Sequence, residues 1–203
     1  MAAKSTLMKL KENEREVRRK LIIDAAINLF ARKPFNQVSM RDIAAEAGIS
    51  AASIYRYFND RDELFVEAFF RKGREIGASL ERHLKETRQV SLEVIGIAYV
   101  DYLLDNDDFF QMMTHFMLEG GINENYLETF NNAIDHYLLN NFDDIFNKIG
   151  VTGNVRLLSH TFFAYLNGIM ITFRKYPGRS EQEIRRHIHR LATIMAGIYR
   201  QGT

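Results

Sequence analysis

The chain has 203 residues, enough for one sizeable domain or for a small domain joined to a larger one. Its two prolines and 12 glycines interrupt it rarely, which favours helices, and the absence of cysteine excludes disulfides, thiolate metal sites and cysteine nucleophiles. No apolar run approaches the ~18 residues of a membrane span, and charge begins at Lys4, so we expect a cytosolic protein with no membrane partner.

Charge is unevenly distributed along the chain. Residues 1–61 contain 12 Lys or Arg side chains and 7 Asp or Glu side chains, whereas the remainder contains 15 and 19. A basic N-terminal segment on an acidic body indicates that one end of the chain meets a polyanion. A solvated basic tail would produce the same imbalance.

The first 85 residues contain the signals of four helices. Residues 1 to about 13 carry lysines but no periodic apolar face, so we expect a loose basic arm there. Apolar residues then recur at three- and four-residue steps until Pro34, which cannot continue a helix. Serines open the next two helices as N-caps, and Gly48, which tolerates a positive φ, separates them. The expected helices occupy about residues 14–33, 39–46, 50–57 and 60–85.

The rest of the chain also has helical patterns, without the two-residue period of a strand and without an internal repeat. The sequence Ser-Glu-Gln-Glu at 180–183 predicts a capping box for the last helix. The expected helices here occupy about residues 91–106, 107–119, 124–149, 154–176 and 180–200. We therefore predict an all-α fold of about nine helices.

Residues 39–58 have the spacing of a helix-turn-helix. A helix of about eight residues, a glycine-bearing turn of about three and a second short helix match this DNA-binding arrangement. Small apolar residues, among them Ile43, Ala44 and Ile54, would fix the two helices near a right angle. Ser50 places a hydroxyl and free backbone N–H groups at the start of the second helix, where a phosphate is electrostatically favoured.

Three segments resemble the tetracycline-repressor (TetR) family. They are Ile-Ile-Asp-Ala-Ala-Ile-Asn-Leu-Phe at 22–30, Ser-Met-Arg-Asp-Ile-Ala-Ala-Glu-Ala-Gly-Ile-Ser at 39–50, and Ser-Ile-Tyr-Arg-Tyr-Phe followed by Asn-Asp-Arg-Asp-Glu-Leu at 53–64. The resemblance implies a DNA-binding domain in residues 1–60, with three helices, and a helical ligand-binding and dimerisation domain in residues 61–203. It also implies a homodimeric repressor that a small apolar ligand releases from a near-palindromic operator. A helical adaptor, or a regulator without ligand control, is the alternative.

The same resemblance assigns DNA contacts. Ser39 and Ser50 are expected to contact phosphates through hydroxyl and backbone, and Arg61 stands where the family usually has a phosphate-holding lysine. The residues expected to face the major groove or its walls are Ala51, Ala52, Ser53, Tyr55 and Arg56. Arg41 is as readily an exposed surface charge as a phosphate contact, and Ser39 would be expected as an N-cap in any helical protein.

Three residues depart from the family pattern. Pro34 occupies a position where a glycine commonly ends the first helix, Ala52 replaces a usual glycine, and Ala51 replaces a frequent lysine. Direct base reading is consequently thin, with Arg56 as the one bidentate fork available for guanine. Operator choice is therefore expected to depend on DNA shape as well.

The second half of the chain is expected to bind the ligand. Residues 109–117 are rich in Phe and Met, which suit a pocket for a flexible apolar molecule. The expected ligand-binding residues are Tyr99, Tyr102, Met113, His115, Phe116, Phe163 and Asn167. Each of them could instead fill a core or make internal hydrogen bonds.

The last two helices resemble the family's dimerisation pair. One apolar stripe contains His160, Phe163, Ala164, Asn167, Gly168 and Ile171, and the other contains Ile188, Leu191, Ala192, Met195, Ala196 and Tyr199. A stripe that faces the core of one subunit would have the same pattern.

An enzyme is the principal rival function. The sequence lacks a Glu-x-x-His pair, a His-Glu-x-x-His motif and a glycine-rich phosphate loop. His187 and His189 are two residues apart, which on a helix points them away from each other. We therefore expect no catalysis, no metal and no cofactor.

Overall fold

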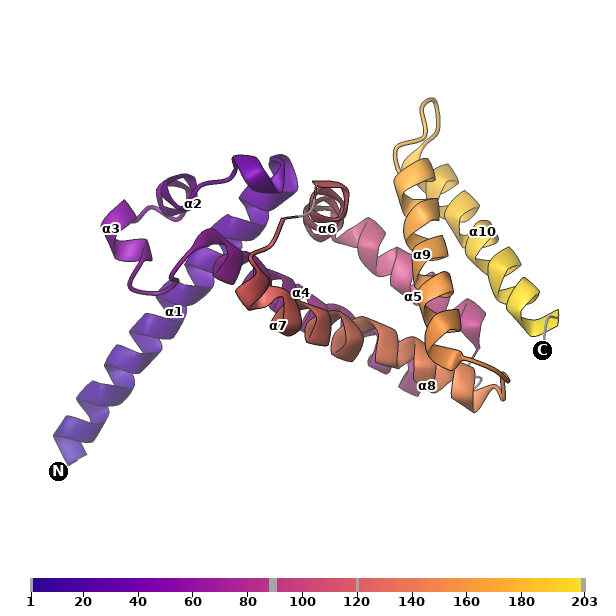
Figure 1. Cartoon of the computed structure of the whole chain (residues 1–203), viewed down its shortest axis with the longest axis horizontal. Helices are drawn as coiled ribbons and strands as arrows, with labels where there is room; N and C mark the ends of the chain where they lie inside the picture. The colour runs from indigo at the N-terminus through magenta and orange to yellow at the C-terminus, as the bar shows by residue number, and fades with distance from the viewer. Residues whose placement is uncertain (1, 88–90, 120, 202–203) are drawn as a thin grey trace. The chain divides into compact units, whose positions relative to one another are not determined.

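The computed structural model describes residues 2–87, 91–119 and 121–201, in which every regular element is a helix (Figure 1). Its α-helices are α1 Ala2–Arg32, α2 Met40–Glu46, α3 Ala51–Ile54, α4 Arg61–Glu86, α5 Leu92–Asp105, α6 Asp107–Glu119, α7 Glu124–Ile134, α8 Asn140–Lys148, α9 Val155–Phe173 and α10 Glu181–Gln201. A 3-10 turn, η1 Phe35–Gln37, and a π-helical turn, η2 Asp135–Leu139, complete the described part. The all-α prediction is confirmed.

The chain folds into two compact units. Unit 1 contains the chain up to Phe69 together with Asp108–Leu127, and unit 2 contains Phe70–Asp107 and the chain from Glu128 onward. The chain passes from one unit to the other inside α4, at the start of α6 and inside α7. The functional division expected at residue 60 remains a prediction.

The N-terminal arm is helical, so the prediction of a loose arm before Glu14 was wrong. α1 begins at Ala2, and no proline or glycine occurs before it ends at Arg32. Alanine, leucine, lysine, glutamate and arginine have high helix propensity, which allows a helix without an apolar face. An ion pair between Glu14 and Arg18, 2.6 Å long, adds support at i,i+4 spacing.

Aromatic rings form the centre of unit 1. Phe65 of α4 lies 5.1 Å from Phe30 of α1 and 4.8 Å from Phe35 of η1, measured between ring centroids. Phe116 of α6 lies 4.7 Å from the Phe65 ring. Because each buried aromatic side chain removes about 150–250 Å² from water, this cluster fixes α1, η1, α4 and α6 to one another.

Unit 2 is built on an antiparallel pair, α5 and α10. Arg185 near the start of α10 pairs with Asp101 near the end of α5. Thr193, about two turns farther along α10, donates a 3.0 Å hydrogen bond to Glu93 near the start of α5. The contact made early in α10 is thus late in α5, and the contact made later in α10 is early in α5, so the two helices run in opposite directions.

The two stripes on the last helices have different surroundings. On α10, Ile188, Ala192 and Ala196 are buried inside unit 2, whereas Leu191, Met195 and Tyr199 are half-buried, so part of this stripe faces the subunit core and its role in a dimer remains a prediction. On α9, by contrast, Ala164 and Gly168 are exposed.

The helix expected over 124–149 contains a π-helical turn at η2. Tyr137 in this turn packs against α4, where a Cβ added to Gly73 would lie 3.3 Å from the Tyr137 Cβ. A Cβ on Gly77 would lie 3.5 Å from the Tyr137 carbonyl oxygen. Glycine at position 73 therefore permits close packing of the wider π turn on α4, whereas a Cβ at position 77 would make an ordinary van der Waals contact.

Candidate nucleic-acid interface

The first turn of α2 contains the predicted serine cap. Ser39 Oγ accepts a 3.1 Å hydrogen bond from the Asp42 N–H, and the Asp42 carboxylate accepts a 3.0 Å bond from the Ser39 N–H. Hydrogen bonds from the Ser39 side chain and backbone lower the pKa of Asp42 below its ordinary value. Ile43 and Ala44 are buried, so α2 packs one face on the core.

Gly48 turns the chain from α2 into α3. Its φ is +68°, a left-handed conformation that favours glycine. The Ile49 N–H donates a 2.9 Å hydrogen bond to the Ala44 carbonyl oxygen and closes the turn. A Cβ on Gly48 would meet nothing within 4 Å, so the backbone conformation, and not lack of space, requires glycine here.

Ser50 caps α3, as predicted. Its Oγ accepts a 3.1 Å hydrogen bond from the Ser53 N–H and lies 2.8 Å from Ser53 Oγ. The helix ends at Ile54 instead of about Tyr57, because the Tyr57 N–H bonds the Ile54 carbonyl at 2.9 Å in a tighter turn. Ile54 and Phe58 are buried and hold α3 on the core.

The outer side of α3 presents most of the residues expected to face the major groove. Ala51, Ala52, Tyr55 and Arg56 are exposed, and we call these four the α3 surface. Ser53 is half-buried and its hydroxyl is bonded to Ser50. The DNA contacts assigned to these residues, and to exposed Arg41, remain predictions.

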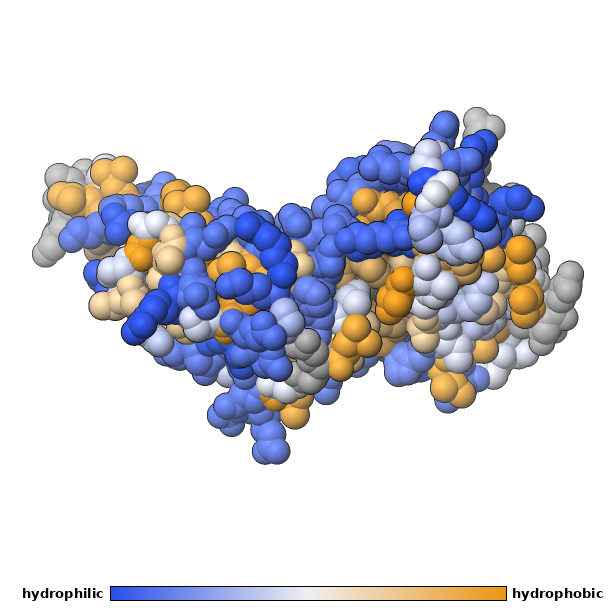
Figure 2. Space-filling model, turned by 90° about the horizontal axis from the view of Figure 1, so that it is seen from above, coloured by the Kyte–Doolittle hydropathy of each residue, from blue (hydrophilic) through white to orange (hydrophobic). Residues whose placement is uncertain are grey.

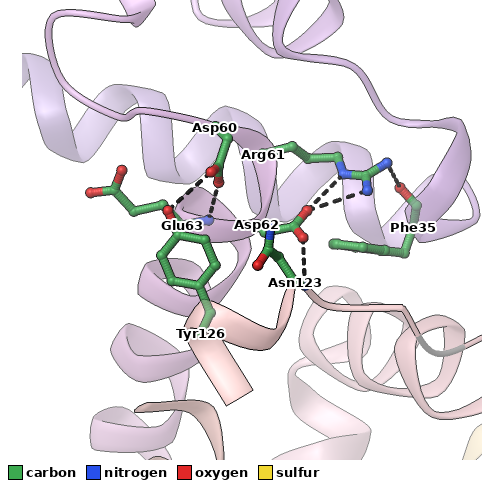
Figure 3. Close-up of polar contacts among 7 residues, drawn as sticks. All are labelled: Phe35, Asp60, Arg61, Asp62, Glu63, Asn123 and Tyr126. Atoms are coloured by element: carbon green, nitrogen blue, oxygen red, sulfur yellow. Dashed lines mark hydrogen bonds and ion pairs between the residues drawn. The ribbon is translucent and has the colours of Figure 1, made fainter. Parts of the chain in front are cut away.

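The first turn of α4 binds the start of α7 (Figure 3). Asp60 accepts a 2.8 Å bond from the Glu63 N–H with Oδ1 and a 3.0 Å bond from the Tyr126 hydroxyl with Oδ2. Asp62 Oδ2 accepts a 2.8 Å bond from the Asn123 N–H. Partial burial, followed by the bond to Asp60, raises the pKa of Tyr126 to about 12. These contacts anchor residues 123–126 to the segment that leaves the helix-turn-helix.

Arg61 is held by the protein on two sides. Its Nη1 donates a 3.2 Å hydrogen bond to the Phe35 carbonyl, and its guanidinium lies 4.2 Å from the Phe35 ring centroid (Figure 3). Nη2 also lies 3.3 Å from Asp62 Oδ1. Arg61 and Ser39 nevertheless line one shallow depression of about 390 Å³. The structure thus brings together two residues predicted to contact phosphate, and that role remains a prediction.

Three of the predicted ligand residues lie in unit 1. Met113 is buried, and Phe116 packs on the rings of Phe35 and Phe65. His115 Nδ1 lies 3.0 Å from the Phe30 carbonyl oxygen, a distance at which a protonated Nδ1 donates to that oxygen. This backbone contact gives the histidine an internal partner between α6 and α1.

The other four predicted ligand residues lie in unit 2. Tyr99 and Asn167 are buried and share hydrogen bonds of 3.2 and 3.3 Å, and the Phe163 ring centroid lies 6.0 Å from that of Tyr99. Burial is the main cause of a raised pKa for Tyr99. Tyr102 is farther along α5 and donates a 3.4 Å bond to Glu75. Ligand binding by any of the seven remains a prediction.

Unit 2 also has a surface pocket of about 580 Å³. It is lined by Leu104, Asp105, Asp107, Arg174, Lys175, Glu181, Gln182, Ile184 and Arg185, which do not include a predicted ligand residue. In the described part of the chain, no three His, Asp or Glu side chains are grouped as a metal site would require. No described helix is both long enough and apolar enough to cross a membrane.

Residues 22–68, which contain the capped α2, the Gly48 turn and α3, match the model of the bacterial regulatory proteins of the tetR family. An uncharacterized HTH-type transcriptional regulator of Haemophilus influenzae is 34% identical over 106 residues, which cover 50% of this chain and 46% of that protein. A second such regulator from the same organism is 39% identical over 67 residues, which cover 33% of this chain and 36% of that protein. Residues 22–68 of this chain are therefore similar to the DNA-binding segment of the tetR family.

Two solved structures share the fold over most of the chain. The fatty acid degradation regulator FadR from Bacillus halodurans has a TM-score of 0.69 at 19% identity, covering 86% of this chain and 94% of that one. A putative tetR family regulator from Shewanella sp. PV-4 has a TM-score of 0.70 at 15% identity, covering 88% and 95%. At these identities the likeness shows the TetR fold alone. The match to the two Haemophilus regulators spans less than half of their length.

Sequence reasoning missed the partners of the α4 cap. Asp60 was predicted to begin the helix, but its bond to Tyr126 joins residues 66 positions apart. No local pattern signals such a pair. The basic groove lined by Lys11, Arg15, Arg18 and Arg56 was also missed. The excess of positive charge in residues 1–61 indicated a basic surface. Because the N-terminal arm was expected to be loose, its cations could not be placed along a helix.

Proposed function

We propose that this chain is a homodimeric regulator that binds near-palindromic duplex DNA through α3 and represses transcription until a small apolar ligand releases it. The observation that carries the proposal is the α3 surface. Its four residues are exposed, whereas Ile54 of the same helix is buried, so α3 is seated on the core with its outer side available. A serine cap at each helix and the left-handed Gly48 fix its direction.

Electrostatics support DNA as the partner. Residues 1–61 carry 12 Lys or Arg and 7 Asp or Glu side chains. Phosphates of a duplex lie at one negative charge per about 1.7 Å of helix axis, so this basic segment gains affinity from counterion release. Ser50 adds the N–H groups of the first turn of α3.

Exposed apolar residues on the last two helices support a dimer. Leu157 and Ile171 of α9 are 58% and 52% exposed, and Ile194 and Ile198 of α10 are 57% and 58% exposed. Figure 2 shows hydrophobic residues at the surface of the part of the molecule that contains α9 and α10. Gly168 on α9 would allow close helix approach, since a Cβ there meets nothing within 4 Å. We propose that α9 and α10 pair with those of a second copy.

Ligand control is proposed to act through α4 and α7. Both helices begin in unit 1 and continue in unit 2, so a ligand bound among the apolar residues of unit 2 could shift them. A ligand changes DNA affinity only by its differential affinity for the two arrangements, and such couplings are typically about 1–3 kcal/mol. Operator DNA must weaken ligand binding by the same factor.

Salt-dependent duplex binding tests the proposed function. Anisotropy titration of labelled duplexes at several salt concentrations should give an affinity that falls steeply as salt rises. An adaptor without DNA-binding activity would show no such binding. Mass spectrometry of the purified protein should detect a bound apolar molecule, and equal affinity of that molecule with and without operator would leave a DNA-binding regulator without ligand control.

A further inference from the structure

The N-terminal part of α1 extends beyond the core of unit 1. Described residues 6–18 are exposed, and the first buried residue of the helix is Ile22. The preceding 20 residues of α1 span about 30 Å at 1.5 Å per residue. In Figure 1 this segment (indigo) continues past α3. It contains seven Lys or Arg and three Glu side chains, so it is a basic helix rather than a neutral one.

A basic groove lies between this segment and the end of α3. Its volume is about 510 Å³. Lys11, Arg15 and Arg18 line it from successive turns of α1, and Arg56 and Tyr57 line it from the turn after α3; Glu14 completes the lining. Four cations and one carboxylate therefore surround the same opening.

Three of the four cations of the groove make no ion pair within the described part of the chain. Glu14 binds Arg18 at 2.6 Å, but the side chains of Lys11, Arg15 and Arg56 make no hydrogen bond or ion pair with any described residue. Arg19 and Arg32 are by contrast paired with glutamates at 3.0 Å. Lys11 and Arg15 stand at i,i+4 on α1, a spacing at which like charges destabilise a helix, and a bound anion would relieve this repulsion.

We propose that Lys11, Arg15, Arg18 and Arg56 form a clamp for the sugar-phosphate backbone of the bound duplex. The clamp rests on the proposed function, because Arg56 also belongs to the α3 surface and DNA seated there brings its phosphates to the groove. Lys11 and Arg18 are separated by about 10 Å along α1, a length that covers several phosphates. In this clamp Arg56 binds the DNA backbone, so the bases are read by the other three residues of the α3 surface.

The salt dependence of duplex binding by the full chain tests the clamp. The variant Lys11→Ala/Arg15→Ala is compared with Arg74→Ala/Arg82→Ala, which removes two exposed cations of α4. Each phosphate contact contributes about −0.9 to the slope of log K against log salt, so the first variant should reduce the slope by about two units and the control by none. Alanine favours helix, and circular dichroism should show that α1 is retained. Arg56→Ala should lower affinity for the operator and for random duplex by the same factor.

Four outcomes overturn the clamp or the part that Arg56 has in it. An unchanged slope for Lys11→Ala/Arg15→Ala overturns it while leaving DNA binding intact, whereas failure of the wild type to bind any duplex overturns the proposed function as well. If Arg56→Ala weakens binding to the operator but not to random duplex, Arg56 reads bases and does not belong to the clamp. Binding of the wild type to phosphatidylserine vesicles that the double variant loses, with the DNA slope unchanged, assigns these cations to a membrane surface instead.

Discussion

The hydroxyl of Tyr126 donates a 3.0 Å hydrogen bond to Asp60, a residue 66 positions earlier that also caps α4. The Asp60 carboxylate therefore caps α4, the helix that follows the helix-turn-helix, and also binds the start of α7 to α4. Asn123 repeats this connection through Asp62. Ligand control is proposed to act through α4 and α7. Substitutions at their junction in unit 1 can therefore be tested both for their effect on stability and for their effect on regulation.

Tyr126→Phe should destabilise the protein by about 0.5–1.5 kcal/mol at pH 8, the usual net value of one hydrogen bond. The pKa of Tyr126 is raised to about 12 in the folded state, above the value of about 10 for unfolded tyrosine. The folded state thus binds more protons between these values, and its extra stability is present below pH 10 and lost as pH rises toward 12. Urea unfolding should show the wild-type advantage shrinking over this range. Tyr165→Phe, whose hydroxyl makes no hydrogen bond with the described residues, is the control; a constant difference between wild type and Tyr126→Phe across this range would contradict the assignment.

Substitutions at Arg61 should separate its internal contacts from its predicted phosphate contact. Arg61→Lys keeps the charge but loses the fork that reaches the Phe35 carbonyl, so stability should fall by about 1 kcal/mol with the salt slope retained. Arg61→Ala should also reduce the salt slope by about one unit. Chemical unfolding and anisotropy titration give the two quantities. The exposed Arg41→Ala should reduce the slope without loss of stability, and an unaltered slope in Arg61→Ala would leave Arg61 with a structural role alone.

Gly96→Ala should destabilise unit 2 by about 1–3 kcal/mol, as overpacking of a core does. The added Cβ would lie 3.0 Å from Phe162 Cζ, and Phe162 is fully buried. Gly197→Ala on α10 is a matched control, since its Cβ meets nothing within 4 Å and alanine favours helix by about 0.8–1.0 kcal/mol. Thermal unfolding should move in opposite directions for the two variants. A stabilised Gly96→Ala would mean that Phe162 yields easily.

Ile194→Glu should weaken the proposed dimer without unfolding the subunit. Ile194 is 57% exposed on α10, so glutamate is tolerated by the isolated chain but places a charge in the proposed four-helix contact. Leu118→Glu, at a position 74% exposed on α6, is the control. Light scattering across a concentration series should show dissociation for Ile194→Glu alone. An unshifted dimer would place the interface elsewhere.

Local chemistry explains which features could be predicted from the sequence. The serine caps at Ser39 and Ser50 and the positive φ at Gly48 depend on neighbouring residues, and all three were predicted. The helicity of residues before Glu14 was missed because propensity alone, without a periodic apolar face, produces it. The bond between Tyr126 and Asp60 was missed because it depends on tertiary packing.

The spacing of two α3 surfaces on DNA is the central claim, and selection from random duplexes measures it most directly. Duplexes enriched by the purified protein should contain a near-palindrome whose half-sites lie about one helical turn apart, roughly 34–36 Å or 10–10.5 base pairs, as paired helix-turn-helix domains require. Alanine-to-lysine substitution at Ala51, which is exposed on α3, should change the enriched half-site and leave its spacing unchanged. Enrichment of no sequence, or of single sites bound by a monomer, would contradict the account.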